Sequence, residues 1–499
     1  MAHHRKVGYA YLREALGTNA FEPAYPARVY PVQKFVRLAE VLQVPESAAP
    51  AADATPLEHL LFALKHEDLD LQAAVLALQK IPAQPLVQQF AQTPGGRYLQ
   101  QACFLWELAH RQKLDAPEAT GPTRPLFDPA VFLTGPSRKF TRWRVDFNGI
   151  GSPHYSPSVR LTPEIKALLA QDILGQARAF IGAMDPDMVQ RAVRWAYLSE
   201  TEGSFAIERE TPTGNRAEAF ARLLSRAHEE VELTEDYLVE LQNLTVLSAM
   251  DQAVQYRVQQ NWLRRDMSVT YVPPAPEHLL PIMEGLLDLA NQKQTGIPPL
   301  VLGSLVSFGF VFAHPFMDGN GRLSRFLFHK IACRDADLPN GLVLPISMAM
   351  ARHEDRYLQA LCSFSALARE QWTVAKVSDM EFDCRFDGAP EIYHYWDATS
   401  CVQFGLEMAQ EALQHDLHEE VQFLHQFDRV YARLNREIDM NNNLMNLLAR
   451  LLVQSQGTLS TNKRKMFMGK GCSAEVLDEA QRIARTALSE EDEDEGMSA

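Results

Sequence analysis

Apolar residues recur three and four positions apart along most of this chain of 499 residues. The spacing is clear over residues 58–65 and 98–108, and it returns over 163–368 and from 391 to about 488. One face of an α-helix repeats with this period, so the pattern predicts helices. Apolar and polar residues alternate over Lys139–Phe147, which predicts a short strand. We therefore predict a mainly all-α fold.

Breaks in this pattern predict four regions. Residues 1–125 form an N-terminal helical region, which a proline-rich linker closes. Residues 140–400 form the central domain, and residues 401–488 form a C-terminal helical region. The last segment, 489–499, carries a run of acidic side chains that cannot bury apolar surface. We expect this acidic tail to be disordered.

Composition excludes several classes of protein. Lys and Arg number 48 against 63 Asp and Glu, a net charge of −15, whereas non-specific binding of nucleic acid needs clustered positive charge. The six cysteines form no CxxC pair, which argues against a disulfide framework or a zinc site. Reduced thiols favour a cytoplasmic protein. The longest apolar run, Leu300–Ala313, is shorter than a membrane helix requires, so we expect a buried core helix and no membrane association.

The candidate chemistry lies in one loop, His314-Pro-Phe-Met-Asp-Gly-Asn-Gly-Arg-Leu-Ser-Arg325. Its glycines permit positive φ and close backbone approach, and a helix is predicted to begin near Gly321. A glycine-rich loop that opens a helix directs backbone N–H groups at an anion. Arg322 and Arg325 lie three apart, so they share one face of that helix and suit a polyphosphate.

Two more side chains of the loop suit phosphate chemistry. Asp318 is a hard oxygen ligand of the kind that Mg²⁺ prefers. His314 can accept a proton near neutral pH. A base, a metal ligand, an anion cradle and two positive clamps together indicate a phosphate-transfer site. The alternative, a glycine turn between two core helices, leaves this combination of side chains unexplained.

The same loop resembles the signature of the Fic (filamentation-induced-by-cAMP) family, HxFx(D/E)GNGRxxR, at every specified position. The resemblance implies a helical core with a small β-hairpin flap, flanked by helical regions at both ends. It also implies protein AMPylation, the transfer of AMP from ATP with Mg²⁺ to a Ser, Thr or Tyr hydroxyl of a target protein, self-modification included. The implied roles are general base for His314, metal ligand for Asp318, and ATP phosphate binding for Gly319, Asn320, Gly321, Arg322 and Arg325. A phosphotransferase branch carries Lys where this chain has Gly319, which argues against that chemistry.

An inhibitory helix is predicted upstream, near residues 195–210. Ser204 and Glu208 lie four apart, hence on one helix face, and resemble the family's inhibitory motif, (S/T)xxxE(G/N). The resemblance implies that Glu208 pairs with Arg325, blocks the γ-phosphate and makes the protein autoinhibited. Arg209 departs from Gly or Asn, which tolerate a left-handed helix end more readily. The alternative is that Ser204 and Glu208 are ordinary helix-surface residues.

Residues 259–263 and 270–276 resemble the family's flap, a hairpin that docks the target segment beside the site. Asn261 and Trp262 are the candidate target contacts, and packing of Trp262 on the core is an equal alternative. Pro273 and Pro274 cannot lie in a central strand, so this segment is expected to lead into a helix near Glu277.

The ends of the chain are less informative. In related long Fic proteins the C-terminal region can resemble a winged helix, and Lys463-Arg-Lys465 is a short basic cluster. A solvated basic face explains one such cluster better than DNA binding does. The N-terminal region carries no recognisable chemistry, and target recognition, contacts in a homo-oligomer and stability alone stay open as its role.

Two classes of function follow from the sequence. The first is a Mg²⁺- and ATP-dependent protein adenylyltransferase, inhibited through Glu208. The second is a regulatory, DNA-associated or nucleotide-binding protein whose site turns over little. The intact His314 and Asp318 favour the enzyme, because a protein that only binds nucleotide does not need both. Within the enzyme class, use of another nucleotide and removal of AMP remain open, since the motif reads phosphates more than bases.

Overall fold

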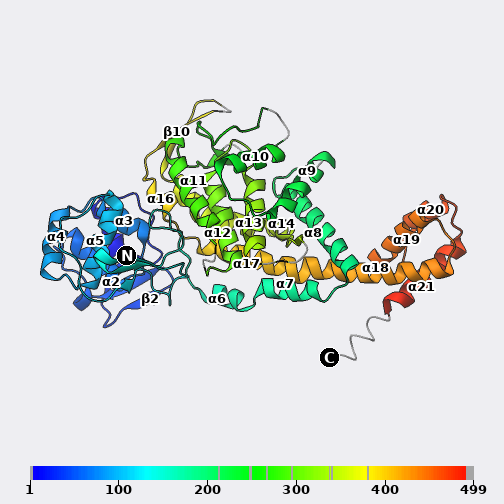
Figure 1. The fold of residues 1–499 in the computed structure, drawn as a ribbon, viewed down its shortest axis with the longest axis horizontal. Coiled ribbons are helices and arrows are strands. Elements are labelled where there is room, and N and C mark those ends of the chain that lie inside the picture. The colour runs from blue at the N-terminus through cyan, green and yellow to red at the C-terminus, as the bar shows by residue number, and fades with distance from the viewer. Residues whose placement is uncertain are drawn as a thin grey trace.

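The computed structural model describes residues 4–489 except 212–213, 247–249, 266–267, 294–295, 337, 339–340 and 379–380. The fold is mainly α-helical, as the apolar spacing predicts, and its strands form small sheets of two or three. Figure 1 shows an N-terminal unit, a central helical bundle and a long helix that leads to a C-terminal group of helices. None of the described helices is both long and apolar enough to cross a membrane.

The N-terminal unit combines helices with two small sheets. Its helices are α1 (Gly8–Ala15), α2 (Pro56–His66), α3 (Leu71–Leu78), α4 (Ala83–Gln92) and α5 (Arg97–His110). The first sheet holds β1 (Ala27–Tyr30), β3 (Val41–Pro45) and β2 (Val36–Leu38), with β3 in the middle, parallel to β1 and antiparallel to β2. The second sheet holds β4 (Arg124–Pro125), β6 (Val145–Phe147) and β5 (Arg138–Phe140), with β6 in the middle.

This unit differs from the helical region predicted over residues 1–125. Its strands are only two to five residues long, too short for a clear alternating pattern. Its core extends past 125 to Trp143 and Phe147, and the Trp143 ring packs edge-on against Phe90 at 5.2 Å. The strand predicted over 139–147 is broken by a 3-10 turn, Thr141–Trp143, so its two halves pair as a hairpin.

The central bundle carries the remaining helices before residue 400. They are α6 (Pro163–Ala170), α7 (Ile173–Gly182), α8 (Pro186–Ile207), α9 (Gly214–Ser225), α10 (Glu235–Thr245), α11 (Pro276–Asn291), α12 (Pro299–Ala313), α13 (Asn320–Ala336), α14 (Ile346–Arg352), α15 (Glu354–Arg369) and α16 (Glu391–His394). The predicted helix start at Pro163 is confirmed, because the Thr162 hydroxyl accepts the Ile165 N–H at 3.2 Å and caps α6.

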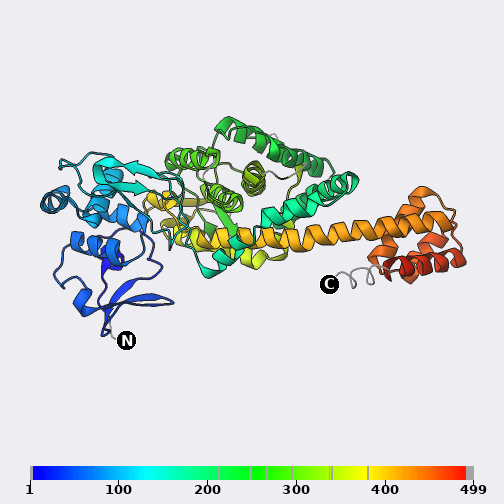
Figure 2. The same cartoon turned by 60° about the horizontal axis from the view of Figure 1, so that its bottom comes forward.

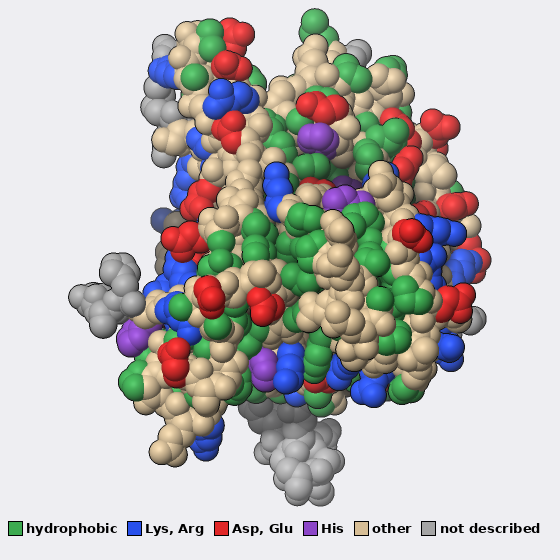
Figure 3. Space-filling view, turned by 90° about the vertical axis from the view of Figure 1, so that its left-hand side faces the viewer, with side chains coloured by type: hydrophobic (Ala, Val, Ile, Leu, Met, Phe, Trp, Pro, Cys, Tyr) green, Lys and Arg blue, Asp and Glu red, His purple; other side chains and the backbone are tan. Residues whose placement is uncertain are grey.

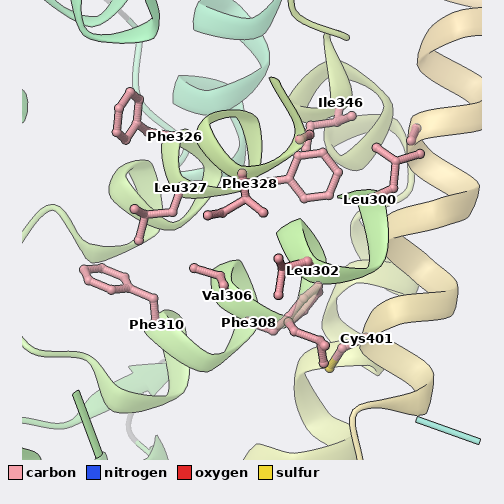
Figure 4. Packing of buried hydrophobic residues seen from close by; sticks show 14 of the residues in the cluster. Leu300, Leu302, Val306, Phe308, Phe310, Phe326, Leu327, Phe328, Ile346 and Cys401 are labelled. Carbon is pink, nitrogen blue, oxygen red and sulfur yellow. The ribbon is translucent and has the colours of Figure 1, made fainter. Parts of the chain in front are cut away.

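Helices α12 and α13 form the centre of the largest hydrophobic core. Helix α12 is buried over nearly its whole length, which confirms the core helix predicted at 300–313. Figure 4 shows Leu302, Val306 and Phe308 of α12 beside Leu327 and Phe328 of α13. Gly303 of α12 lets the two helices approach closely, because a β-carbon there would lie only 3.0 Å from the carbonyl oxygen of Phe328. Close packing therefore fixes the loop between these two helices.

Two β-hairpins lie beside this loop. Strands β7 (Leu263–Arg265) and β8 (Ser268–Tyr271) pair antiparallel and confirm the predicted flap hairpin, which leads into α11 at Pro276. The second hairpin, β9 (Trp372–Lys376) and β10 (Phe382–Phe386), lies outside every predicted strand. The two hairpins share a small core around Val272 and Trp372.

The C-terminal region begins as a continuous helical rod (Figure 2). Helix α17 (Thr399–Glu411) passes through a π-helical turn, Ala412–Leu417, into α18 (His418–Glu437). Helices α19 (Asn442–Gln454), α20 (Thr461–Met468) and α21 (Ala474–Ser489) then pack against the far end of α18.

The predicted boundary at residues 400–401 falls inside α17 rather than between domains. Side chains up to Val421 belong to the central core, and the C-terminal core begins at Val430. From 401 to 489 the chain is helical with no strand, so the strands of a winged helix are absent, since these helices bury their apolar faces on one another. The predicted disordered tail, 489–499, lies outside the described residues apart from Ser489.

The end of the molecule that carries the N-terminal unit is seen in Figure 3. Lys and Arg side chains are interspersed there with Asp and Glu, around a middle where hydrophobic side chains gather. The positive charges of this face are therefore divided by negative ones.

Candidate active site

The loop between α12 and α13 holds the predicted chemistry. Helix α12 ends at His314, whose φ of 48° is left-handed, and Gly319 takes a φ of 83° just before α13 begins. Asn320 closes the loop: its amide donates to the Phe316 carbonyl at 2.8 Å, and its side-chain oxygen accepts the Phe316 N–H at 3.0 Å. The Asn320 side chain thus holds the loop together, which leaves only its backbone N–H for an anion.

The His314 ring has one nitrogen bonded to the backbone and the other free. Its Nδ1 lies 3.3 Å from the Val311 carbonyl, so Nδ1 carries the proton and Nε2 is the free base. Desolvation, together with the positive charge of Arg257, lowers the pKa of His314 from 6.5 to about 4. The imidazole is therefore neutral at pH 7 and able to accept a proton.

Arg325 is the most buried charged group of the site, with 1% of its surface exposed. Its Nε donates to the Ser204 hydroxyl at 2.8 Å, and its Nη2 donates to the Ser204 carbonyl at 3.0 Å and to a Glu208 carboxylate oxygen at 2.8 Å. Its Nη1 is buried and has no hydrogen-bond partner among the described residues. An unsatisfied guanidinium N–H is costly, so this geometry suits an anionic ligand at Nη1.

Arg322 lies one turn nearer the start of α13 and is also buried. Its Nη1 donates to the Thr245 carbonyl of α10 at 3.1 Å, and its guanidinium lies over the Phe205 ring. A carboxylate oxygen of Asp318 lies 3.8 Å from its Nη2. The Asp318 side chain is 53% exposed, so its carboxylate is open to a cation.

Ser204 and Glu208, predicted to share a helix face, both face α13. Ser204 lies in the last turn of α8, and Glu208 caps that helix at its C-terminus. A β-carbon at Gly321 would lie 2.2 Å from a Glu208 carboxylate oxygen. The carboxylate therefore lies directly over the first turn of α13, where the helix dipole favours negative charge. Burial alone would raise the pKa of Glu208, but Arg325 and Arg322 outweigh it and hold the pKa below its usual value.

The end of α8 explains how Arg209 replaces glycine or asparagine. Arg209 adopts a left-handed φ of 57°. Its N–H donates to the Ala206 carbonyl at 2.9 Å, and the Glu210 N–H donates to the Phe205 carbonyl at 3.0 Å. This pair of bonds is the Schellman helix end, which normally places glycine at the left-handed position. The chain thus forms the expected turn with a residue that is strained there.

The two predicted flap contacts lie in different surroundings. The Asn261 amide donates to the Phe316 carbonyl of the loop between α12 and α13 at 3.3 Å, and its Oδ1 is buried with no partner among the described residues. Trp262 is half-buried, and its ring packs edge-on against Phe382 of β10 at 5.7 Å. Asn261 therefore lies at the loop, whereas Trp262 packs on the second hairpin.

Two residues that support the loop were not predicted from the sequence. Gln242 of α10 donates to the Asp318 carbonyl at 3.2 Å, and Arg257 donates through Nε to the His314 carbonyl at 2.8 Å. Neither residue lies in a local motif. Tyr256-Arg257 before the flap is the only nearby signal, and a single arginine carries little information by itself.

The loop, its two buried arginines and its histidine define a helical protein with an anion site at a helix N-terminus. Residues 232–332 match the family model described as Fic/DOC family, so this segment of the chain is similar to Fic domains.

The chain is 30% identical over 127 residues to protein adenylyltransferase fic-1 of Caenorhabditis elegans, a match that covers 25% of this chain and 23% of that protein. It is 40% identical over 65 residues to protein adenylyltransferase Fic of Nematostella vectensis, covering 13% and 15% of the two proteins. The chain thus matches less than a quarter of the length of these relatives.

Solved structures are also similar. A Fic family protein from Desulfovibrio desulfuricans aligns with a TM-score of 0.39 and 19% identity, over 63% of this chain and 90% of that one. Fic-1 of C. elegans, residues 134–508, aligns with a TM-score of 0.36 and 14% identity, over 73% and 93%.

Proposed function

We propose that this protein transfers AMP from ATP to a hydroxyl group of a protein. One observation carries the proposal: a neutral His314 and the unpartnered Nη1 of buried Arg325 flank the same glycine loop at the start of α13. Relatives over the matched segment are named protein adenylyltransferases, which supports this chemistry over other uses of a phosphate site.

The reaction would use each group once. The target hydroxyl oxygen attacks the α-phosphorus, its proton passes to Nε2 of His314, and the bond from the α-phosphorus to the bridging oxygen breaks to release pyrophosphate. The N-terminal turn of α13 and the two arginines hold the phosphate oxygens. A general base typically contributes about 10²–10⁴ in rate, so His314→Ala should be nearly inactive.

Mg²⁺ fits the exposed carboxylate of Asp318. A hard oxygen ligand at the mouth of an anion site suits this ion, which usually binds one or two carboxylates together with substrate phosphates. Bound there, it would neutralise charge on the phosphates.

We further propose that the protein inhibits itself through the contact among Ser204, Glu208 and Arg325, here called the latch. The Glu208 carboxylate lies over the first turn of α13 and forms an ion pair with Nη2 of Arg325. It therefore competes with the terminal phosphate of ATP for the same charge. The trigger that opens the latch would have to remove the carboxylate from Arg325.

Incorporation of labelled AMP from Mg·ATP tests the proposal. We expect weak labelling by the wild type, a large increase in Glu208→Gly, and loss of labelling when His314→Ala is added. Glu202→Gly is the matched control, because Glu202 is exposed on the same helix. Equal labelling of wild type and Glu208→Gly would reject the latch. Absence of labelling in every variant, with transfer from another nucleotide, would reject ATP as the donor.

A further inference from the structure

Arg257 is a buried cation that forms no ion pair with any carboxylate in the described part of the chain. It precedes the flap and is only 5% exposed. Every hydrogen bond that it donates goes to a backbone carbonyl: Nε to His314 at 2.8 Å, Nη1 to Gln259 at 3.2 Å, and Nη2 to Pro274. Its own N–H donates to the Pro315 carbonyl at 2.8 Å. A charge buried at this cost is expected to have a specific role.

The four carbonyls belong to two structures that must meet for catalysis. Gln259 and Pro274 flank the flap hairpin on its two sides, since β7 and β8 lie between them. His314 and Pro315 begin the catalytic loop. The planar guanidinium joins three of these carbonyls in one fixed geometry, which a lysine cannot reproduce.

The contact also bears on a strained position. His314 holds a left-handed φ, an arrangement that costs free energy for a residue with a β-carbon and persists only where the surroundings enforce it. Arg257 fixes the carbonyl of His314 itself. Loss of this bond would let the backbone relax and carry the imidazole away from its position.

We propose that Arg257 is a positioning residue that ties both ends of the flap to His314. Through this residue, docking of the target segment on the flap is coupled to the orientation of the His314 imidazole. The proposal rests on the proposed function, because it assigns a role to the base of that reaction. It adds the residue that couples the target-docking hairpin to the chemistry.

The pKa of His314 is a measurable quantity that a purely structural role of Arg257 would leave unchanged. Burial and, second to it, Arg257 lower the pKa of His314, while the bond to Val311, Glu208 and Asp318 raise it. Around Arg257, Tyr271, Tyr393 and Glu277 favour its charged form, and burial opposes it and lowers its pKa to about 10. Arg257 is therefore charged at neutral pH, and its removal should raise the pKa of His314.

The test compares Arg257→Ala and Arg257→Lys, each added to Glu208→Gly. The pKa of His314 is measured by NMR titration of labelled histidine, with the His314 resonance identified by its loss in His314→Ala. In Arg257→Ala we expect this pKa to rise from about 4 but to stay below 6.5, because burial, the larger cause of the shift, remains; the acid limb of the pH–rate profile then moves to higher pH. We expect kcat to fall about 10²-fold, the cost of a misplaced catalytic group, with the KM for ATP unchanged because the phosphate-binding arginines are intact.

Arg257→Lys separates charge from position. It should keep the pKa of His314 low, yet lower kcat, because an ammonium cannot reach all three carbonyls. Arg222→Ala, an exposed arginine on α9, is the control and should change neither quantity.

The proposal is overturned if Arg257→Ala loses thermal stability while the folded fraction keeps the kcat and the His314 pKa of its parent. It is also overturned if Arg257→Lys matches its parent in kcat. Should Glu208→Gly transfer no nucleotide at all, the proposed function fails, while the NMR titration still decides whether Arg257 controls His314.

Discussion

Two of the contacts between helices α8 and α13 differ sharply in burial. In the latch, the Glu208 side chain is 37% exposed and lies 2.8 Å from Arg325. Two turns earlier, Glu200 is 0% exposed and lies 2.8 Å from Nε2 of His329, whose side chain is 2% exposed. The same pair of helices thus carries one contact at the surface of the site and one in the interior.

The interior contact, here called the anchor, comprises Glu200, His329 and Ser347. Glu200 accepts the Ser347 N–H at 2.8 Å and also accepts the Ser347 hydroxyl, at the first turn of α14. Next to it, α8 touches the α14 backbone: a β-carbon at Gly203 would lie 2.3 Å from the Met348 nitrogen. The anchor therefore fixes α8 to two helices at once.

The difference in burial would let the proposed latch open while the rest of the protein stays folded. Breaking a buried polar contact leaves its partners unpaired and costs several kcal/mol, whereas a partly exposed ion pair contributes little because water replaces it. The Glu208 carboxylate can therefore leave Arg325 while α8 stays in place. We expect the anchor to govern stability and the latch to govern activity.

The largest effect should come from breaking the anchor. Glu200→Ala leaves the Ser347 donors and the His329 ring without their buried partner, and should lower the free energy of unfolding by about 3–5 kcal/mol. Glu202→Ala, an exposed neighbour on α8, should change it by less than about 0.5 kcal/mol. Urea denaturation measures both, and equal midpoints for the two variants would contradict the division of roles.

The next effect concerns the latch. Glu208→Gly should raise the rate of AMP transfer by about 5–150-fold, the usual range of coupling between two sites. Because the Glu208 carboxylate is partly exposed and buried Arg325 keeps its two hydrogen bonds to Ser204, the free energy of unfolding should fall by less than in Glu200→Ala. Rates and denaturation curves of the same preparations test this pairing. If Glu208→Gly were as unstable as Glu200→Ala, the latch would contribute to stability as much as the anchor does, and the proposed difference between them would be wrong.

A smaller effect is expected at Arg209, where the chain departs from the family's glycine or asparagine. Arg209→Gly removes the left-handed strain and should raise the free energy of unfolding by about 1 kcal/mol. It also removes the ion pair with Glu354, which is exposed on both sides and contributes little. Arg209→Ala is the control, because it loses the same pair but keeps the strained β-carbon, and it should show no gain in thermal denaturation.

The smallest effect should be that of pH on the latch. The pKa of Glu208 lies below 4.5 in the folded protein, so the latch is fully formed above that pH and weakens only as pH falls through the folded value. The ratio of Glu208→Gly to wild-type activity should therefore stay constant from about pH 6 to about pH 8. A ratio that falls toward one at the acid end would show that protonation opens the latch.

Local chemistry made part of this molecule predictable. The spacing of apolar residues predicted the helical fold and the core helix α12, and Thr162–Pro163 predicted a helix start that the capping bond confirms. The pattern Ser204–Glu208 placed both side chains on one face. These features depend on residues within a few positions of one another, where helix geometry alone sets the relation.

Long-range contacts were not predictable in this way. Arg257 meets His314 across 57 positions, and Glu200 meets Ser347 across 147. The hairpin β9–β10 and the strands of the N-terminal unit are short and owe their pairing to neighbours distant in sequence. The core boundary also moved into α18, because a helix can carry one core at its start and another at its end.

The sequence by itself determined which residues could do chemistry: the histidine, the acid, the glycines and the two arginines of one loop, and a hydroxyl and a carboxylate one helical turn apart upstream. The tertiary structure alone decided which of them meet. It placed Glu208 over the start of α13, left one nitrogen of Arg325 unpartnered, and set Arg257 behind the base. Local periodicity follows from the backbone, whereas contacts between distant segments follow from how whole helices pack.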